Sequence, residues 1–266
     1  MQLYGRVAVI TGGAGGIGAA LARRFAAEGV AGLVVADVDQ AAAAGVAAHL
    51  ATAGAPAVGV GVDVTDEQQV RDLVAGAERR YGRIDLFCSN AGVAPGGGLE
   101  ADDTDWRRAW AVNVLAHVYG ARAVLPGMLE RGGGYLLQTC SAAGLLTAVG
   151  DAAYTATKHA ALGLAEWLAV TYGDRGIRIS ALCPQGVRTR MLEDGLAARH
   201  LGARVVAAAG AILEPEAVAD AVVAGLAAER FLILPHPEVA TYAQRKAADP
   251  DGWLEAMRGL VGRVAG

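Results

Sequence analysis

The chain has 266 residues, 54% of them hydrophobic, and a formal net charge of −4. This length and apolar content fit one large α/β domain and exclude a disulfide-stapled miniprotein and a disordered chain. The weak acidity argues against nucleic-acid and membrane partners, and no apolar run approaches the roughly 18 residues that a membrane span needs.

Short apolar runs typical of strands alternate along the chain with longer, alanine-rich stretches typical of helices. Near-continuous apolar runs indicate strands covered on both faces, and their alternation with helices predicts a parallel sheet. We therefore expect a single α/β domain over residues 1–266, with a doubly wound, Rossmann-like sheet of about seven strands and helices on both faces. The expected strands span residues 6–10, 32–36, 57–62, 84–88, 135–139, 177–183 and 231–234. The expected helices span residues 16–28, 40–53, 67–81, 104–131, 152–173 and 215–229.

The last third of the chain departs from this alternation. Residues 190–213 are expected to form an irregular insertion that serves as a lid and substrate loop. The tail, residues 236–266, is expected to carry a capped amphipathic helix that follows Asp249. Apolar side chains in the lid, including Met191 and Leu192, predict an apolar substrate pocket.

A glycine-rich turn follows the first expected strand and opens the first expected helix. Glycines at a helix N-terminus let a phosphate approach the backbone and leave N–H donors free for it. The alternative is an ordinary tight turn between a strand and a helix. The residues expected to bind a dinucleotide here are Gly12, Gly15, Gly16, Ile17 and Gly18.

Asp37 follows the second expected strand and is the candidate ligand of the adenosine ribose. Its carboxylate can accept hydrogen bonds from the ribose hydroxyls and would repel a 2′-phosphate. No lysine or arginine stands in the glycine-rich turn or just after Asp37 to offset that repulsion. The sequence therefore predicts NAD rather than NADP, with Asp39 as the N-cap of the next helix.

Tyr154 and Lys158 are spaced i, i+4 and so share one face of an expected helix. A lysine ammonium close to a phenol favours the phenolate, so Tyr154 is a candidate general acid/base with a lowered pKa. Ser141 lies at the end of the fifth expected strand, where its hydroxyl can hold the same substrate oxygen.

With these motifs in this order, the sequence resembles the short-chain dehydrogenase/reductase family over essentially the whole chain. The residues that match the family's catalytic set are Asn113, Ser141, Tyr154 and Lys158. The further residues that match its cofactor-binding segments are Asp63, Val64, Asn90, Ala91, Gly92, Pro184, Val187 and Thr189. Ser89, Ser180 and Gln185 depart from the residues common in the family, and Gln185 is a candidate contact of the nicotinamide or substrate.

The resemblance implies direct hydride transfer between a nicotinamide and a substrate carbon. Tyr154 exchanges the proton with the substrate oxygen, and Ser141 orients that oxygen, so both bind the substrate. Lys158 binds the nicotinamide ribose, and Asn113 supports a water-linked proton relay behind it. Tyr154 and Lys158 thus also count among the cofactor-binding residues.

The remaining expectations concern assembly and location. Helix 152–173 is apolar nearly all round, so one side should pack on the sheet and the other on a second subunit, or on other parts of the chain. Relatives are commonly homotetramers, so a homo-oligomer, tetramer or dimer, is expected. Cys88, Cys140 and Cys183 are expected to be buried free thiols, and with no visible signal peptide they indicate a cytoplasmic protein. Five scattered histidines predict no metal site.

The sequence thus predicts an NAD-dependent alcohol dehydrogenase/ketone reductase. The expected substrate is a small molecule, a secondary alcohol or its ketone of carbocyclic, aromatic or steroid-like type. A 3-oxoacyl thioester reductase/3-hydroxyacyl dehydrogenase is the alternative within the family. An NAD-dependent epimerase and an NAD-binding sensor without turnover are the alternatives outside this chemistry.

Overall fold

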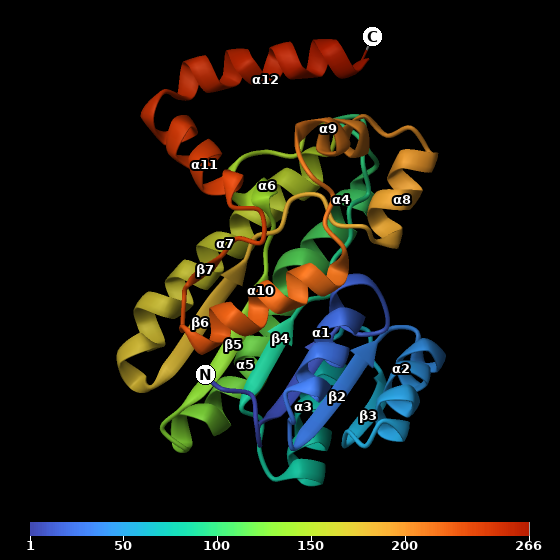
Figure 1. The fold of residues 1–266 in the computed structure, drawn as a ribbon, viewed down its shortest axis with the longest axis vertical. Coiled ribbons are helices and arrows are strands. Elements are labelled where there is room, and N and C mark those ends of the chain that lie inside the picture. Colours follow the sequence, from blue (N-terminus) through green and yellow to red (C-terminus); the bar gives the residue numbers. More distant parts are fainter. Residues whose placement is uncertain (266) are drawn as a thin grey trace.

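A computed structural model, which describes residues 1–265, folds into one seven-stranded sheet between two layers of helices (Figure 1). All six strand pairs are parallel, in the order β3-β2-β1-β4-β5-β6-β7. This confirms the predicted doubly wound parallel sheet. The strands are β1 (Val7–Thr11), β2 (Gly32–Asp37), β3 (Ala57–Gly61), β4 (Leu86–Ser89), β5 (Gly134–Thr139), β6 (Ile177–Leu182) and β7 (Leu232–Ile233).

Two apolar clusters, one on each face of the sheet, hold the helices in place. Helices α1, α2 and α10 contribute to one cluster, and α3, α5 and α7 contribute to the other. The helices are α1 (Gly16–Ala27), α2 (Gln40–Thr52), α3 (Glu67–Tyr81), α4 (Asp103–Trp110), α5 (Ala116–Glu130), α6 (Ala142–Leu145), α7 (Ala152–Tyr172), α8 (Arg190–Ala197), α9 (Leu201–Ala209), α10 (Pro215–Ala227), α11 (Glu238–Ala248) and α12 (Pro250–Ala265). A π-helical turn, η1 (Ala111–Leu115), joins α4 to α5, and a 3₁₀ turn, η2 (Gly173–Arg175), comes after α7.

Carboxylate caps start several of these helices. Asp39 accepts a hydrogen bond from Ala42 N (3.0 Å) at the start of α2, and Asp66 accepts one from Gln68 N (2.8 Å) at the start of α3. At the start of α12, Asp249 accepts one from Gly252 N (3.0 Å). Such caps satisfy N–H groups that have no partner inside a helix. The predicted cap of α2 and the predicted tail helix are thus present.

Two expectations about helices were wrong. Residues 104–131 do not form one regular helix, because the π-helical turn η1 interrupts it. Residues 190–213 are not irregular, because they contain α8 and α9. Between these two short helices Arg199 has a φ of +56°, a left-handed conformation that ends helical continuity. The tail also holds α11, a helix that was not expected.

The two strands beside the centre of the sheet define where a ligand can bind. The chain order of the strands reverses between β1 and β4, and open α/β sheets bind ligands beyond the carboxyl ends of the strands at such a reversal. At this end of the molecule lie α8, α9, α11 and α12, with α12 packed against α9 and α11 (Figure 1).

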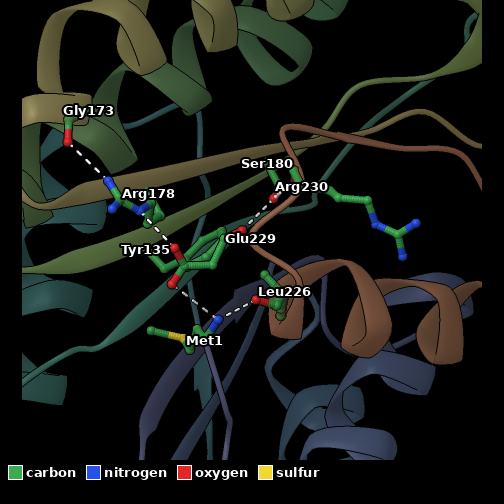
Figure 2. A network of polar contacts seen from close by, with 8 residues as sticks. All are labelled: Met1, Tyr135, Gly173, Arg178, Ser180, Leu226, Glu229 and Arg230. Atoms are coloured by element: carbon green, nitrogen blue, oxygen red, sulfur yellow. Dashed lines mark hydrogen bonds and ion pairs between the residues drawn. The ribbon is translucent and has the colours of Figure 1, made fainter.

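A polar network lies near the N-terminal ends of β5 and β6, opposite to the carboxyl ends of the strands (Figure 2). Buried Ser180 contacts the Tyr135 hydroxyl at 2.7 Å, so the serine that departs from the family pattern has a partner. Arg178 Nε donates to Glu229 Oε2 at 2.9 Å, and the amine of Met1 lies 3.5 Å from Glu229 Oε1. The network therefore ties the N-terminus to the strands far from the site. None of the helices in residues 1–265 is long and apolar enough to cross a membrane.

Candidate active site

One large cavity, of about 1630 Å³, lies at the carboxyl ends of the strands. Every residue expected to bind cofactor or substrate lines it, and so do three of the four expected catalytic residues. Asn113 is the exception, because it is fully buried behind the cavity. The fold therefore brings the predicted site residues to one location, and their roles remain predictions.

The glycine-rich turn brings the backbone of β1 and α1 to the cavity. Gly12 has a φ of +62°, and a Cβ there would lie 2.8 Å from Ala91 Cα, so this position needs glycine. A Cβ on Gly16 (φ +49°) would lie 3.0 Å from Thr189 Cγ2. Beside Gly15, no atom lies within 4 Å of where a Cβ would be. Because Gly15 caps α1 with no side chain, no cap side chain accepts from the first N–H groups of the helix.

The carboxylate of Asp37 lies beside this turn at the end of β2. It accepts hydrogen bonds from Ala14 N at 3.0 Å and from Asp39 N at 3.2 Å. Asp39 itself caps α2, so the two neighbouring acids have separate roles. Asp37 fixes the turn and still lines the cavity, where its charge faces an incoming ligand.

The segments after β3 and β4 form the wall beside the turn. Asp63 accepts hydrogen bonds from Thr65 N (2.9 Å) and Thr65 Oγ1 (2.7 Å), and the adjacent Val64 is buried. The Asn90 amide nitrogen donates to Thr11 O at 3.0 Å, and its oxygen accepts from Thr139 Oγ1 at 3.2 Å. Asn90 thus links the ends of β1, β4 and β5.

Ser141, Tyr154 and Lys158 come from the end of β5 and from α7. Asp151 starts α7 by accepting a hydrogen bond from Tyr154 N at 2.9 Å. One turn later Lys158 is buried, with its ammonium nitrogen 5.5 Å from the centre of the Tyr154 ring. The same nitrogen donates to Thr139 O at 3.0 Å. The lysine is therefore held between the strand end and the tyrosine.

Burial dominates the electrostatics of this trio. Desolvation raises the pKa of Tyr154 to about 12, and hydrogen bonding to Ser141 opposes the shift. The expected lowering of the Tyr154 pKa is thus wrong in this structure, because withdrawing the phenol from water disfavours the phenolate. Desolvation also lowers the pKa of Lys158, while the nearby thiols of Cys140 and Cys183 raise it.

Asn113 lies in the π-helical turn η1 between α4 and α5. Its side-chain oxygen accepts from Val93 N at 2.9 Å, and its nitrogen donates to Val93 O at 2.9 Å and to Thr157 Oγ1 at 3.1 Å. These bonds anchor η1 to α7 and to the segment after β4. π-helical turns occur frequently at functional sites, because they displace one residue from the regular helix.

His236 is a residue of the site that the sequence analysis missed. It is buried after β7, and its Nδ1 accepts a hydrogen bond from Gln185 N at 3.1 Å. Its Nε2 faces Gly186 O at 3.1 Å and Ala211 O at 3.2 Å, so Nε2 carries the proton. His236 thereby fixes the loop of Pro184, Val187 and Thr189. A histidine between two prolines was the only signal in the sequence.

The C-terminal helices form the outer wall of the cavity. Trp253, Met257 and Leu260 of α12 line it together with Met191 of α8. Lys246 of α11 donates to Leu145 O at 2.9 Å and holds α11 against the segment after β5. The cavity is thus polar and tightly bonded at the strand ends, while its outer wall combines these apolar side chains with charged ones such as Arg245 and Arg263.

Comparisons with known proteins agree with this geometry. The profile of the short chain dehydrogenase family matches residues 6–199. A 1-deoxy-11-beta-hydroxypentalenate dehydrogenase of Streptomyces exfoliatus is 40% identical over 88% of this chain and 84% of its own length. A 2,5-dichloro-2,5-cyclohexadiene-1,4-diol dehydrogenase of Sphingobium indicum is 36% identical over 71% of this chain and 75% of its own.

A solved structure is similar over nearly the full length. It is a short chain dehydrogenase/reductase from Burkholderia phymatum in complex with NAD. The two chains superpose with a TM-score of 0.86 and are 33% identical, over 94% of this chain and 96% of the other.

Proposed function

The chain belongs to the short chain dehydrogenase family, and from this premise we propose that it is an NAD-dependent oxidoreductase that interconverts a secondary alcohol and its ketone. One observation carries the proposal: Ser141, Tyr154 and Lys158 lie at the same cavity as the glycine-rich turn. A proton-exchanging group and a dinucleotide cradle therefore border one space, which is what hydride transfer from an alcohol requires.

The residues at the β1 and β2 ends fit NAD. The open space beside Gly15 and the free N-terminus of α1 suit a pyrophosphate, and the close approach at Gly12 keeps the turn tight. Asp37 would accept hydrogen bonds from the adenosine ribose and repel a 2′-phosphate. Asp63 and Val64 would flank the adenine, and Pro184, Val187 and Thr189 would meet the nicotinamide. When bound, NAD⁺ accepts the hydride and NADH donates it.

Proton transfer falls to the residues of this chain. We assign the exchange of the proton with the substrate oxygen to the Tyr154 hydroxyl, and the orientation of that oxygen to Ser141. Burial is the main cause that raises the Tyr154 pKa. The nearby Lys158 ammonium therefore has to favour the phenolate during alcohol oxidation. Lys158 has one carbonyl partner, which leaves N–H groups for the nicotinamide ribose and a water. Asn113 would support that water-linked relay through its place in η1.

The outer wall supports a ring-bearing, largely apolar substrate. Trp253, Met257, Leu260 and Met191 offer apolar surface at the cavity. The two relatives are named for a hydroxypentalenate and for a cyclohexadiene diol, which are carbocyclic compounds. We therefore favour carbocyclic, aromatic or steroid-like alcohols over 3-hydroxyacyl thioesters.

Exposed apolar side chains support a homo-oligomer. On α7, Trp167 is 57% and Val170 is 86% exposed. Trp110, the last residue of α4, and Leu115, the last residue of η1, are also exposed. Large apolar groups clustered on neighbouring helices are typical of subunit contacts. We propose a tetramer or dimer formed through these helices, in the cytoplasm, where the three free thiols would stay reduced.

The test is a steady-state assay with NAD⁺ or NADP⁺ and a panel of cyclic, aryl, steroidal and 3-hydroxyacyl alcohols. We expect NADH formation with a carbocyclic or aromatic alcohol and at least about tenfold weaker use of NADP⁺. Preference for NADP⁺ would contradict the role of Asp37. Purified protein that retains NAD and forms no NADH with any alcohol would favour an epimerase, and reversible NAD binding without turnover would favour a sensor.

A further inference from the structure

Three polar side chains are buried together on the face of the sheet that α5 and α7 cover. They are Ser89 of β4, His117 of α5 and Gln138 of β5, and none is more than 4% exposed. Ser89 and Gln138 are register partners on adjacent strands, so their side chains share one face. Gly120, one turn after His117, brings α5 close to this face, because a Cβ there would lie 3.3 Å from Ser89 Oγ.

This cluster, Ser89–His117–Gln138, lacks hydrogen-bond partners. Five of its side-chain atoms make no hydrogen bond of ordinary geometry: Ser89 Oγ, His117 Nδ1 and Nε2, and Gln138 Oε1 and Nε2. Direct pairing cannot satisfy all of them, because an amide offers two donors and an oxygen acceptor while a neutral imidazole offers one of each. Buried polar groups without partners are rare in native proteins, and internal water commonly bridges them.

The cluster lies next to the lysine of the active site. Desolvation and, less strongly, the charge of Lys158 lower the pKa of His117 to about 3, and a hydrogen-bonding approach of Gln138, short of ordinary geometry, opposes that shift. His117 comes four residues after Asn113, hence about one helical turn, and a Cβ on Gly92 would lie 3.4 Å from Asn113 Oδ1 and 3.6 Å from Lys158 Nζ. Lys158 donates to Thr139 O, the residue after Gln138, and has further N–H groups to donate.

We propose that the Ser89–His117–Gln138 cluster is an internal water site whose water solvates the Lys158 ammonium from behind, with His117 as a positioning residue. This inference rests on the proposed function, because Lys158 matters for the pH dependence only if Tyr154 exchanges the proton. The site is distinct from a relay through Asn113, whose side-chain amide is occupied by Val93 and Thr157.

His117 acts in this site as a neutral group. With its pKa lowered to about 3, it carries no charge at the pH values where the enzyme works. It therefore offers water one N–H donor and one acceptor, and it does not take up a further proton at these pH values. Among the described residues, Lys158 is the charged group whose field reaches His117, and the thiols of Cys140 and Cys183 act on Lys158 in turn.

The first experiment compares pH profiles of alcohol oxidation at saturating NAD⁺. In His117→Leu the water loses its partners, so the charged form of Lys158 is disfavoured and the phenolate of Tyr154 loses part of the cation that stabilises it. We expect the rise of kcat/KM with pH to move by about one pH unit towards alkaline pH, which is about a tenfold loss at neutral pH. His117→Asn, which keeps a donor and an acceptor, should restore part of the shift.

The matched control is Val124→Ala, a truncation of another fully buried side chain of α5. It disturbs packing and leaves the polar cluster intact, so its pH profile should coincide with that of the wild type. A profile that is unchanged in His117→Leu, or shifted equally in Val124→Ala, would overturn the positioning role.

The second experiment is a high-resolution crystal structure of the wild-type protein. We expect at least one water within hydrogen-bond distance of His117 and Gln138, and its loss or displacement in His117→Leu. A cluster with no water in the wild type would overturn the proposal. Because this result needs no turnover, it separates failure of the water site from failure of the proposed function, which absence of activity with every alcohol would indicate.

Discussion

The two halves of the cavity are built in opposite ways. At the strand ends, Asn90 links three strands, Asp37 holds the glycine-rich turn, and Lys158 is buried against the backbone of β5. In the outer wall, α8 and α12 bury none of their described residues. Helices α9 and α11 bury one each, Val205 and Val239.

This difference indicates which part of the function each half carries. Side chains held by several hydrogen bonds and by burial keep one geometry, which proton exchange and cofactor binding need. Helices with few buried contacts open and shift at lower cost. The strand ends therefore define the reaction, and the outer helices select the substrate.

The largest expected effect comes from the buried lysine of the strand-end half. Lys158→Met should lower kcat/KM for alcohol oxidation by about 100- to 10 000-fold, because the phenolate of Tyr154 loses its nearby cation. Burial already lowers the Lys158 pKa, which means that the charged form is disfavoured by the fold. The variant should therefore melt no earlier than the wild type.

Steady-state kinetics and thermal unfolding on the same preparations check this prediction. Activity within threefold of the wild type would remove Lys158 from the mechanism. A loss of activity accompanied by a much lower melting temperature would point to a structural role instead.

The second-largest effect is expected for cofactor preference when Asp37 is substituted. In Asp37→Asn the charge is removed, while the amide oxygen can still accept from Ala14 N. Removing one charge pair at close range should shift the ratio of kcat/KM for NADP⁺ and NAD⁺ by about 100-fold towards NADP⁺. Kinetics with both cofactors measure the ratio, and an unchanged ratio would show that Asp37 does not select against the 2′-phosphate.

The pH dependence should have opposite signs in the two directions of the reaction. Oxidation needs the Tyr154 phenolate, and burial raises the pKa of this group to about 12. Below the operative pKa the phenolate fraction grows up to about tenfold per pH unit, so oxidation should accelerate as pH rises. Reduction uses the phenol and should slow at high pH. Oxidation that slows as pH rises from neutral would contradict the assignment.

The smallest effect is expected in the outer wall. Lys246→Met removes the hydrogen bonds that hold α11 to the segment after β5, so α11 and α12 should become less well fixed. We expect the KM for the alcohol to rise about threefold, because half-buried hydrogen bonds of this kind contribute roughly 1 kcal/mol net, with the KM for NAD⁺ unchanged. Substrate-variation kinetics at saturating NAD⁺ measure this. A larger rise in the KM for NAD⁺ than in the KM for the alcohol would contradict the proposed division of roles between the strand ends and the outer helices.

The location of the strand-end residues was predictable from the sequence because its signals there are local. Apolar runs mark the strands, and the glycines, the acids and the tyrosine–lysine spacing mark segments near the strand ends, so topology alone brings them together. The pattern did not reveal the π-helical turn at Asn113, which depends on side-chain bonds to Val93 and Thr157, residues distant in sequence.

The outer half was less predictable for the same physical reason. Helices α8 and α9 are short, and Gly195 and Gly202 weaken their periodic pattern, so residues 190–213 resembled an irregular loop.

Two features near the strand ends also depend on the folded structure. His236 acquires its role only when β7 brings it beside Gln185. The raised pKa of Tyr154 likewise depends on burial, which spacing along one helix cannot reveal.

The most direct test of the account compares the wild type with Tyr154→Phe for NAD⁺ binding and for turnover of the best alcohol. The substitution removes one hydroxyl and keeps the ring. The account predicts unchanged NAD⁺ affinity and a loss of turnover of at least about 100-fold. Turnover close to that of the wild type would contradict the central claim that the Tyr154 hydroxyl exchanges the proton.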